Sequence, residues 1–254
     1  MAGYKSMVSM SKMHSVDRDR PYVIINAAIS IDGKISSVGN DSRLSSKHDL
    51  VRVHRLRSMV DAVMVGINTV LMDDPMLNIR YVEGREGSNP SRVVVDSHAR
   101  ISPTSKIMST CKIIPTIIAV SEHADQARVE RLREMGATVI VVGRDRVDLR
   151  MLLKWLRDMG IGKVLVEGGG ELNWSLLKEG LVDELIITVV PVVLGGRDAK
   201  TLVEGEGFLR VEEGRRLMLI DVNRMEESGE VILHYKVLNN SNNNRESVDT
   251  KDSG

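Results

Sequence analysis

The stretch VLVEGGGELNWSLL, residues 164–177, carries three successive signals that indicate the fold. Its apolar start is typical of a buried strand, which runs into the acidic residue Glu167. Three consecutive glycines, residues 168–170, follow, and the remainder has the pattern of a helix. A strand that turns through glycines into a helix exposes backbone N–H groups to which an anion can bind. The motif therefore predicts an α/β fold with a phosphate site at this turn; the alternative is a tight turn with a structural role alone.

Strand-like and helix-like runs alternate through the rest of the chain. Apolar runs predict strands at residues 22–30, 61–66, 91–96, 112–120, 137–142, 162–167 and 182–196, the last with a kink at Pro191, and a pair of strands within 215–238 joined around residues 228–229. Helical spacing of apolar residues predicts one helix along Leu50, Val53, Leu56 and Val60 and another along Leu149, Leu152, Leu153 and Leu156.

This order of elements predicts a mostly parallel central sheet flanked by helices on both faces, with antiparallel C-terminal strands. We expect a single domain over residues 21–238. Residues 1–20 are polar and aperiodic and are expected to form a flexible leader, and residues 239–254 are expected to form a disordered polar tail.

The composition limits the classes of function. The chain has 35 basic and 35 acidic residues, and a net charge of zero argues against a broad nucleic-acid surface. We see no apolar run long enough for a membrane span and no signal core, so we expect a cytoplasmic protein. A single cysteine, Cys111, excludes an internal disulfide and a Cys-cluster zinc site, and the histidines lack metal-ligand spacing. We therefore expect no metal.

Polar residues near the end of the first predicted strand are candidates for proton chemistry. Asn26, Asp32 and Lys34 lie at and just beyond this strand end, which in an open α/β sheet borders the ligand crevice. An acid and an amine two residues apart can handle protons or hold hydroxyl groups. The alternative is an ordinary Asp-Gly turn.

Three further groups suit a nucleotide or a phosphate. Arg57 flanks a predicted helix and could clamp a phosphate bidentately, although an arginine there is usually a surface residue. Thr69 and Asp73 are four residues apart and share a helix face, which is also compatible with an ordinary capped helix. Ser97 and Arg100 follow a strand and could grip a ribose 2′-phosphate, or form a plain polar loop.

Seven stretches in their order along the chain resemble the reductase family of riboflavin biosynthesis. They are SIDGKIS, DSRLSS, VHRLR, VGINTVLMDDPML, RVVVDS, VEGGGELNWSLL and LVDELIITVVPVVLGG, and the likeness extends from about residue 22 to residue 238. The chain is most similar to the stand-alone archaeal and fungal type, which reduces 2,5-diamino-6-ribosylamino-4(3H)-pyrimidinone 5′-phosphate. The resemblance implies a dihydrofolate-reductase-like fold, NADPH as the cofactor with NADH as the alternative, a phosphorylated pyrimidine substrate and a homodimer.

The resemblance also implies roles for individual residues. Those expected to bind the cofactor are Thr69, Asp73, Ser97, Arg100, Gly143, Gly168, Gly169, Gly170 and Leu172. Those expected to bind the substrate are Asn26, Arg57, Leu77, Arg80 and Glu167. Hydride transfer to the ribosyl carbon needs a proton at the ring oxygen, which Asp32, Lys34 or Glu167 would supply or relay, and the sequence does not choose among them.

One departure from the bacterial relatives narrows the expected reaction. Those proteins carry a zinc deaminase with a His-x-Glu and Pro-Cys-x-x-Cys signature, which one cysteine cannot supply. We therefore expect reduction without deamination. Two alternatives stay open: a reductase of the deaminated pyrimidine or of a pterin on the same fold, and a nucleotide-binding module without catalysis.

Overall fold

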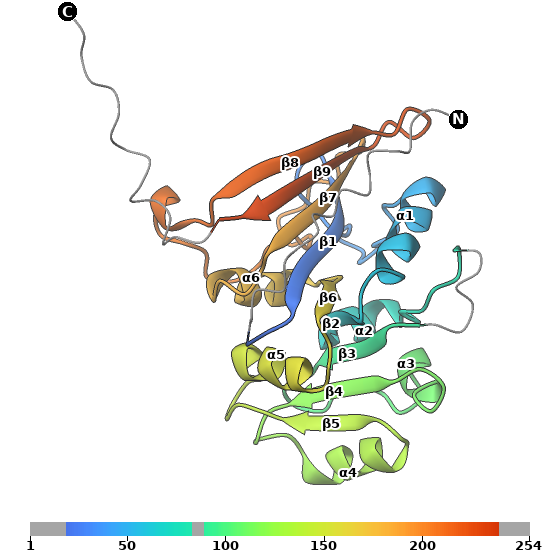
Figure 1. Ribbon diagram of the computed structural model, residues 1–254. Coiled ribbons are helices and arrows are strands. Elements are labelled where there is room, and N and C mark those ends of the chain that lie inside the picture. Colours follow the sequence, from blue (N-terminus) through green and yellow to red (C-terminus); the bar gives the residue numbers. More distant parts are fainter. Residues whose placement is uncertain (1–18, 83–88, 239–254) are drawn as a thin grey trace, which may run out of the picture.

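The computed structural model describes residues 19–82 and 89–238, which build one nine-stranded sheet in the order β5-β4-β3-β2-β6-β1-β7-β9-β8 (Figure 1). The strands are β1 (Tyr22–Ser30), β2 (Ala62–Gly66), β3 (Ser91–Val95), β4 (Thr116–Val120), β5 (Thr138–Val141), β6 (Lys163–Val166), β7 (Glu184–Val190), β8 (Leu217–Arg224) and β9 (Val231–Val237). The pairings from β5 through β7 are parallel, and β9 runs antiparallel to β7 and β8. The predicted mostly parallel sheet with antiparallel C-terminal strands is confirmed. Residues 1–18 of the predicted leader and the whole predicted tail lie outside the described residues.

Helices cover both faces of this sheet. They are α1 (Lys47–Arg57), α2 (Ile67–Asp73), α3 (Lys106–Ser109), α4 (Gln126–Glu134), α5 (Leu149–Asp158) and α6 (Gly170–Lys178), with a 3-10 turn η1 (Val211–Glu213) before β8. Because successive strand residues point to opposite faces, each strand contributes to two apolar cores. Met64 of β2 joins the core that contains Leu152 of α5 and Leu176 of α6. Its neighbour Val63 joins the second core, on the opposite face, together with Val129 of α4.

The helix α1 departs from the predicted apolar stripe. Leu50, which the helical spacing placed on the buried face, is 40% exposed. The buried face instead carries Asp49, Arg52, His54 and Arg57. Of the predicted stripe, Leu56 is buried in the core as the periodicity indicated, Leu50 is exposed, and Val60 lies beyond the end of the helix. The periodicity therefore located the helix but did not reveal that its buried face is mostly polar.

Two predicted strands are shorter than expected because each contains a proline. The strand predicted at residues 112–120 begins only at Thr116, directly after Pro115. The strand β7 ends at Val190, directly before Pro191. Proline has no N–H to donate to a ladder, so it marks the boundary of a strand inside a sheet.

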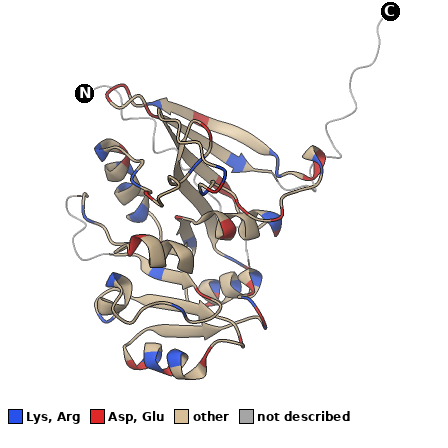
Figure 2. Ribbon diagram, turned by 180° about the vertical axis from the view of Figure 1, so that it is seen from behind, with Lys and Arg blue, Asp and Glu red and all other residues tan. Residues whose placement is uncertain are grey.

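Charged residues of both signs are interspersed over the surface of the described part (Figure 2). This distribution agrees with the equal numbers of basic and acidic residues in the sequence. Among the helices of residues 19–82 and 89–238, none is long and apolar enough to cross a membrane.

Candidate active site

The glycine turn lies at the carboxyl end of β6, near the middle of the sheet. Glu167 continues from the strand and donates its backbone N–H to Met64 O of β2 at 2.9 Å. Gly168 has a positive φ of 98°, a conformation that favours glycine, and its peptide bond to Gly169 is cis. The helix α6 then begins at Gly170, with Gly169 as its N-cap. The predicted succession of strand, glycine turn and helix is confirmed.

A second helix N-terminus lies beside this turn. The helix α2 has the N-cap Gly66, whose N–H donates to Gly168 O at 2.8 Å. A Cβ on Gly66 would lie 3.6 Å from Leu172 Cβ, and a Cβ on Gly169 would lie 3.4 Å from Thr69 Oγ1. Two helices therefore start next to each other behind glycine N-caps, which have no side chain to satisfy their free N–H groups. Such a place suits an anion, because both helix dipoles present their positive ends to it.

At two other glycines predicted to bind cofactor, the neighbouring atoms leave no room for a side chain. A Cβ on Gly170 would lie 2.6 Å from both Thr201 O and Glu204 Cγ, because the loop before η1 crosses directly over the start of α6. A Cβ on Gly143, which has a φ of 83°, would overlap the carbonyl oxygen of Arg146. Each of these positions therefore has a structural reason for glycine, and their predicted contacts with a cofactor stay predictions.

Ser97 and Arg100 lie farther along the same carboxyl edge, after β3. Ser97 O accepts a hydrogen bond from Ser121 N at 3.1 Å, and Ser97 Oγ accepts one from Val147 N at 3.1 Å. The loops after β3, β4 and β5 therefore meet at Ser97. Arg100 is half-exposed and donates to Asn68 Oδ1 in the first turn of α2 at 3.1 Å. The predicted cofactor residues thus follow one edge from β6 through β2 and β3 toward β5.

Glu167 and Arg57 form a bidentate ion pair on the other side of the glycine turn. Arg57 Nε and Nη2 donate to the two carboxylate oxygens of Glu167, each at 2.7 Å. The side chains are 10% and 13% exposed, so the pair is mostly withdrawn from water. Arg57 Nη1 donates to Asn78 O at 2.8 Å. One N–H on each Nη is then left over for a ligand, and the predicted phosphate contact of Arg57 stays a prediction.

The segment that contains Leu77 and Arg80 is fixed by side chains from elsewhere. Three hydrogen bonds hold two successive peptide groups: Arg57 Nη1 donates to Asn78 O (2.8 Å), Ile79 N donates to Asn89 Oδ1 (2.8 Å) and Arg80 N donates to His54 Nδ1 (3.0 Å). Leu77 is buried, at 2% exposure, and has a φ of 50°. The Arg80 side chain remains exposed, over the ring of Tyr81. A fixed backbone therefore carries an exposed guanidinium, for which no ion pair with the residues in 19–82 and 89–238 is found.

His54 is one of the residues that sequence reasoning left without a role. It lies on the buried face of α1, and because its Nδ1 accepts from Arg80 N–H, the proton of the neutral ring is on Nε2. Burial first, and then the nearby charges of Arg57 and Arg80, lower the pKa of His54 to about 4, although the charge of Glu167 opposes them. His54 is thus a neutral acceptor that sets the position of Arg80.

Asp32 anchors a loop. Its carboxylate accepts hydrogen bonds from Ser30 Oγ at 2.7 Å, from Leu194 N at 3.0 Å and from Gly195 N at 2.7 Å. The Ser30 hydroxyl and the two loop N–H groups lower the pKa of Asp32 to about 2. The carboxylate is therefore ionised at neutral pH, a state that accepts protons and has none to donate.

Lys34 is half-buried and faces the loop that follows β7. Lys34 Nζ donates to Ala199 O at 3.1 Å, and its backbone forms an isolated antiparallel bridge with Thr201. An ammonium group has three donors, so this contact leaves two N–H groups for a ligand.

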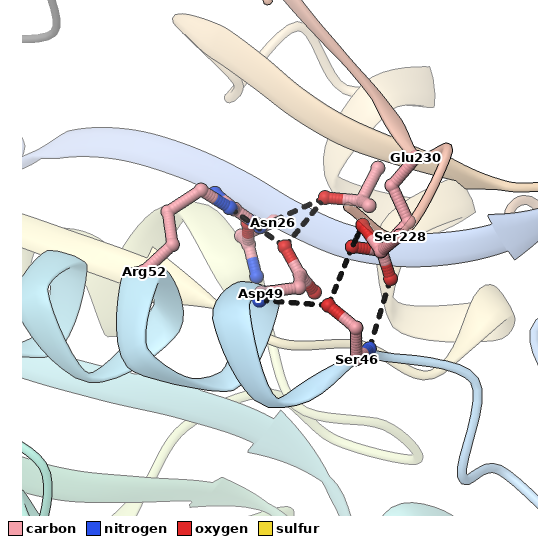
Figure 3. Close-up of polar contacts among 7 residues, drawn as sticks. Asn26, Ser46, Asp49, Arg52, Ser228 and Glu230 are labelled. Carbon is pink, nitrogen blue, oxygen red and sulfur yellow. Dashed lines mark hydrogen bonds and ion pairs between the residues drawn. The ribbon is translucent and has the colours of Figure 1, made fainter. Parts of the chain in front are cut away.

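Asn26 belongs to a buried polar cluster that the sequence did not reveal (Figure 3). Arg52 is only 1% exposed, and its Nε donates to Asp49 Oδ1 at 2.7 Å. Arg52 Nη2 donates to Asn26 Oδ1 at 2.9 Å and to Thr188 Oγ1 at 3.0 Å. Thr188 in turn donates to Asp49 Oδ1 at 2.8 Å. The cluster thus joins α1 to β1 and β7.

The start of α1 is fixed by a carboxylate from the C-terminal hairpin. Ser46 is the N-cap and accepts a hydrogen bond from Asp49 N at 3.1 Å, which is half of a capping box. The other half comes from Glu230, 1% exposed, which accepts from Ser46 N at 2.8 Å and from Ser46 Oγ at 2.6 Å (Figure 3). Ser228 also donates to Glu230, at 2.8 Å. Since these partners are 184 residues apart, no local sequence signal could have found them.

Asp73 connects the two sides of the site. It is the last residue of α2, one turn after Thr69. Burial raises the pKa of its carboxyl, and the side chain of Ser42, in the segment before α1, opposes this shift. The predicted cofactor residues and the predicted substrate residues therefore occupy adjoining parts of one carboxyl edge, with the glycine turn and Glu167 between them. Across residues 19–82 and 89–238, no group of three or more His, Cys, Asp and Glu side chains could hold a metal ion.

The chain is similar to several known proteins. The 2,5-diamino-6-ribosylamino-4(3H)-pyrimidinone 5′-phosphate reductase of Methanothermobacter thermautotrophicus is 50% identical over 200 residues, which cover 79% of this chain and 91% of that protein. The protein of the same name from Archaeoglobus fulgidus is 43% identical over 209 residues, covering 78% and 94% of the two chains. The structure of Acinetobacter baumannii RibD has a TM-score of 0.75 at 26% identity, and the match covers 87% of this chain and 58% of that one. The model of the RibD C-terminal domain matches residues 21–233, and the chain therefore belongs to the RibD C-terminal domain family.

Proposed function

We propose that this protein reduces the ribosyl group of 2,5-diamino-6-ribosylamino-4(3H)-pyrimidinone 5′-phosphate to a ribityl group, with NADPH as the reductant. The observation that carries the proposal is the pair of glycine-capped helix N-termini beside the Glu167–Arg57 ion pair. The first suits the diphosphate of a dinucleotide, and the second offers charged groups to a second ligand. The two archaeal relatives bear the name of this reductase and are covered almost over their whole length.

The residues of the glycine turn fit a nicotinamide dinucleotide. Gly168 and Gly169 leave the space that a side chain would fill, and Thr69 Oγ1 borders it. In the proposal the diphosphate lies against these N–H groups, and Arg100 reaches the adenosine end, where its charge favours a 2′-phosphate. When bound, the nicotinamide supplies the hydride, and the rest of the reaction depends on how the chain orients the substrate and handles a proton.

The substrate phosphate is assigned to Arg80 and to the remaining N–H groups of Arg57. Arg80 is exposed on a fixed backbone, so its guanidinium is available to a ligand at this point of the site. Glu167 lies between these arginines and the glycine turn, so the ribose carbon that takes up the hydride comes to lie beside the cofactor site. Most of the rate enhancement then comes from positioning.

We assign the proton donor to Lys34. The bond from C1′ to the ring oxygen breaks as the hydride arrives at C1′, and the ring oxygen needs a proton to become the new hydroxyl. Asp32 is ionised and engaged with the loop at Leu194, and both oxygens of Glu167 already accept from Arg57. Lys34 keeps two free N–H groups and lies just beyond the end of β1.

A homodimer is part of the proposal. The strand β8 lies at the outer edge of the sheet (Figure 1). Its large apolar side chains are between 41% and 51% exposed, namely Leu217, Met218, Leu219, Ile220 and Val222. Because neighbouring strand residues point to opposite faces, both faces of this edge are apolar. A second copy of the chain would cover them and remove an open sheet edge. A monomer mass by light scattering at micromolar concentration would contradict this.

The decisive experiment follows the absorbance of the reduced nicotinamide with the purified protein and three ligands. We expect oxidation of NADPH with the diamino pyrimidine phosphate, and little with the deaminated pyrimidine phosphate or with a dihydropterin. Preference for the deaminated compound would support the first alternative on the same fold. NADPH binding without turnover on any of the three would support a nucleotide-binding module and refute the proposal.

A further inference from the structure

The Asn26 side chain has only one orientation that its surroundings allow. Its oxygen lies 2.9 Å from Arg52 Nη2. A guanidinium has donors and no acceptor, so the amide group that faces Arg52 must be the oxygen, and the NH2 group must face the other way. Arg52 is itself immobilised, because it is 1% exposed and also bonded to Asp49 and Thr188 (Figure 3).

The amide nitrogen of Asn26 is free for a ligand. Within residues 19–82 and 89–238, Asn26 Nδ2 has no hydrogen-bond partner. Several polar side-chain atoms of the described residues lack a partner and are also closed off from solvent, but Asn26 Nδ2 is not one of them. The sealed atoms of this cluster are Arg52 Nη1 and Asp49 Oδ2. The Asn26 NH2 group therefore reaches accessible space, while the charges behind it do not.

Glu167 lies next to Asn26 in the sheet. The strands β1 and β6 are parallel with Ile25 opposite Val166, and the next residue on each is Asn26 and Glu167. Alternation places both side chains on the face covered by α1, and neighbouring strands are about 4.8 Å apart. Arg52 holds the first of these side chains and Arg57 holds the second. A ligand at this point meets a fixed donor, the Asn26 amide, beside a fixed acceptor, the Glu167 carboxylate.

We propose that Arg52, held by Asp49, is a positioning residue that turns the Asn26 NH2 group toward the substrate and thereby selects a ligand edge with an acceptor beside a donor. A lactam edge, with a carbonyl oxygen next to a ring N–H or an amino group, has this arrangement. The inference rests on the proposed function and deepens it, because it assigns recognition of the heterocycle to a pair of side chains on β1 and β6. The buried ion pair thus determines specificity without touching the substrate.

The test compares variants by their KM for the diamino pyrimidine phosphate, with KM for NADPH and the melting temperature measured on each. Asn26→Ala removes the donor without adding charge, and we expect KM for the pyrimidine to rise about tenfold, as for the loss of one hydrogen bond. Asn26→Asp keeps an oxygen for Arg52 and replaces the donor by an acceptor, so its increase should be at least as large. KM for NADPH should change little in both, because Asn26 is assigned to the substrate side of the site.

The role of Arg52 is tested by the double variant Asp49→Leu/Arg52→Met, which removes both buried charges together so that neither is left unpaired. The Asn26 amide is then free to rotate, and we expect a several-fold rise in KM for the pyrimidine in a folded protein. If this pair does not fold, Asp49→Asn/Arg52→Gln serves instead, because glutamine can face Asn26 with either a donor or an acceptor. Arg52→Lys keeps a donor only, and should hold KM closer to the wild type than either double variant does.

The experiment distinguishes failure of this inference from failure of the proposed function. If the wild type reduces the pyrimidine and the Asn26 variants leave KM unchanged, the assignment of the donor is overturned and the proposed function stands. If the Asn26 variants raise KM but a folded double variant does not, Arg52 is not a positioning residue. If the wild type does not reduce the pyrimidine, the proposed function is overturned, and this inference with it.

Discussion

The helices α5 and α1 cover opposite faces of the same sheet and are built on opposite principles. The helix α5 buries Leu149, Leu152, Leu153 and Leu156, which all join one apolar core. The helix α1 buries two arginines, an aspartate and a histidine, and of its residues only Leu56 joins the second core. Apolar burial on α5 stabilises the fold without specifying a ligand, whereas each buried polar group of α1 holds a neighbour in one orientation. Charged side chains are thus buried on α1, where they fix the position of neighbouring groups, and apolar side chains are buried on α5, where they only stabilise the packing.

The strongest test of this difference removes one charge from α1. Arg52→Met alone leaves Asp49 buried without its partner, and we expect a loss of about 3–5 kcal/mol in the free energy of unfolding. The double variant with Asp49→Leu should recover most of this loss, since replacing both charges of a buried pair is often neutral. Urea unfolding measures both. Equal stability of the single and double variants would show that the pair is not sealed from water.

The matching test on α5 removes hydrocarbon. Leu153 is fully buried, so Leu153→Ala should cost about 2–5 kcal/mol through the lost burial and the cavity that remains. The protein that stays folded should keep its KM for both ligands, because α5 lies on the face away from α1. A selective change in substrate KM would mean that the two faces are not functionally separate.

The sequence predicted α5 well and α1 poorly for a physical reason. Periodicity detects burial only when buried residues are apolar, which holds for the four leucines of α5. On α1 Arg52 pairs locally with Asp49, but the further partners that satisfy these buried charges, Thr188, Glu167 and Asn26, are far away along the chain. No window of sequence contains both members of these pairs. The hydrophobic pattern therefore placed Leu50 on the buried face, although it is exposed.

The glycine turn was predictable because its signal is local. The strand, the glycines and the start of α6 are consecutive, and the predicted turn lies where the structure has it. The sequence could not show that Gly66 places the start of α2 beside this turn, because that contact depends on the pairing of β2 with β6. The sequence also gave no way to choose between Asp32 and Lys34 as the proton donor, because the contact that occupies Asp32 comes from the distant loop at Leu194. Local motifs could thus be predicted from the sequence, whereas the contacts between distant segments could not.

Arg80→Ala tests the exposed end of the polar region. The side chain lies on the surface, so its removal should leave stability unchanged. In the proposed function it removes a charge-assisted contact with the substrate phosphate worth about 1.5–3 kcal/mol, so substrate KM should rise about 10- to 100-fold. KM for NADPH is the internal control. Equal effects on both ligands would show that Arg80 lies in the wrong half of the site.

The N-cap of α1 tests the link to the C-terminal hairpin. Ser46→Ala removes the oxygen that accepts from Asp49 N and the hydroxyl that donates to the buried carboxylate of Glu230. We expect a loss of about 2 kcal/mol, the upper end for an N-cap, because Glu230 also loses a donor. Ser46→Thr keeps the hydroxyl and serves as the control. If both variants unfold at the same denaturant concentration as the wild type, the hairpin does not help to place α1.

The smallest expected effect is a pH dependence that α1 has and the buried face of α5 lacks. Burial first, and then the charges of Arg57 and Arg80, lower the pKa of His54 from 6.5 to about 4. Between these values His54 is protonated in the unfolded chain and neutral in the folded protein. The stability that His54 contributes is therefore complete above pH 6.5 and is lost as the pH falls toward 4. At about pH 5.5 the loss should be about 1 kcal/mol. Because other groups titrate in this range, the measurement is a difference in melting temperature between the wild type and His54→Asn, whose Oδ1 can accept from Arg80 N–H but does not titrate. The wild type should lose more stability than the variant on acidification, and parallel curves would mean that water reaches His54 and that the position of Arg80 does not depend on a neutral imidazole.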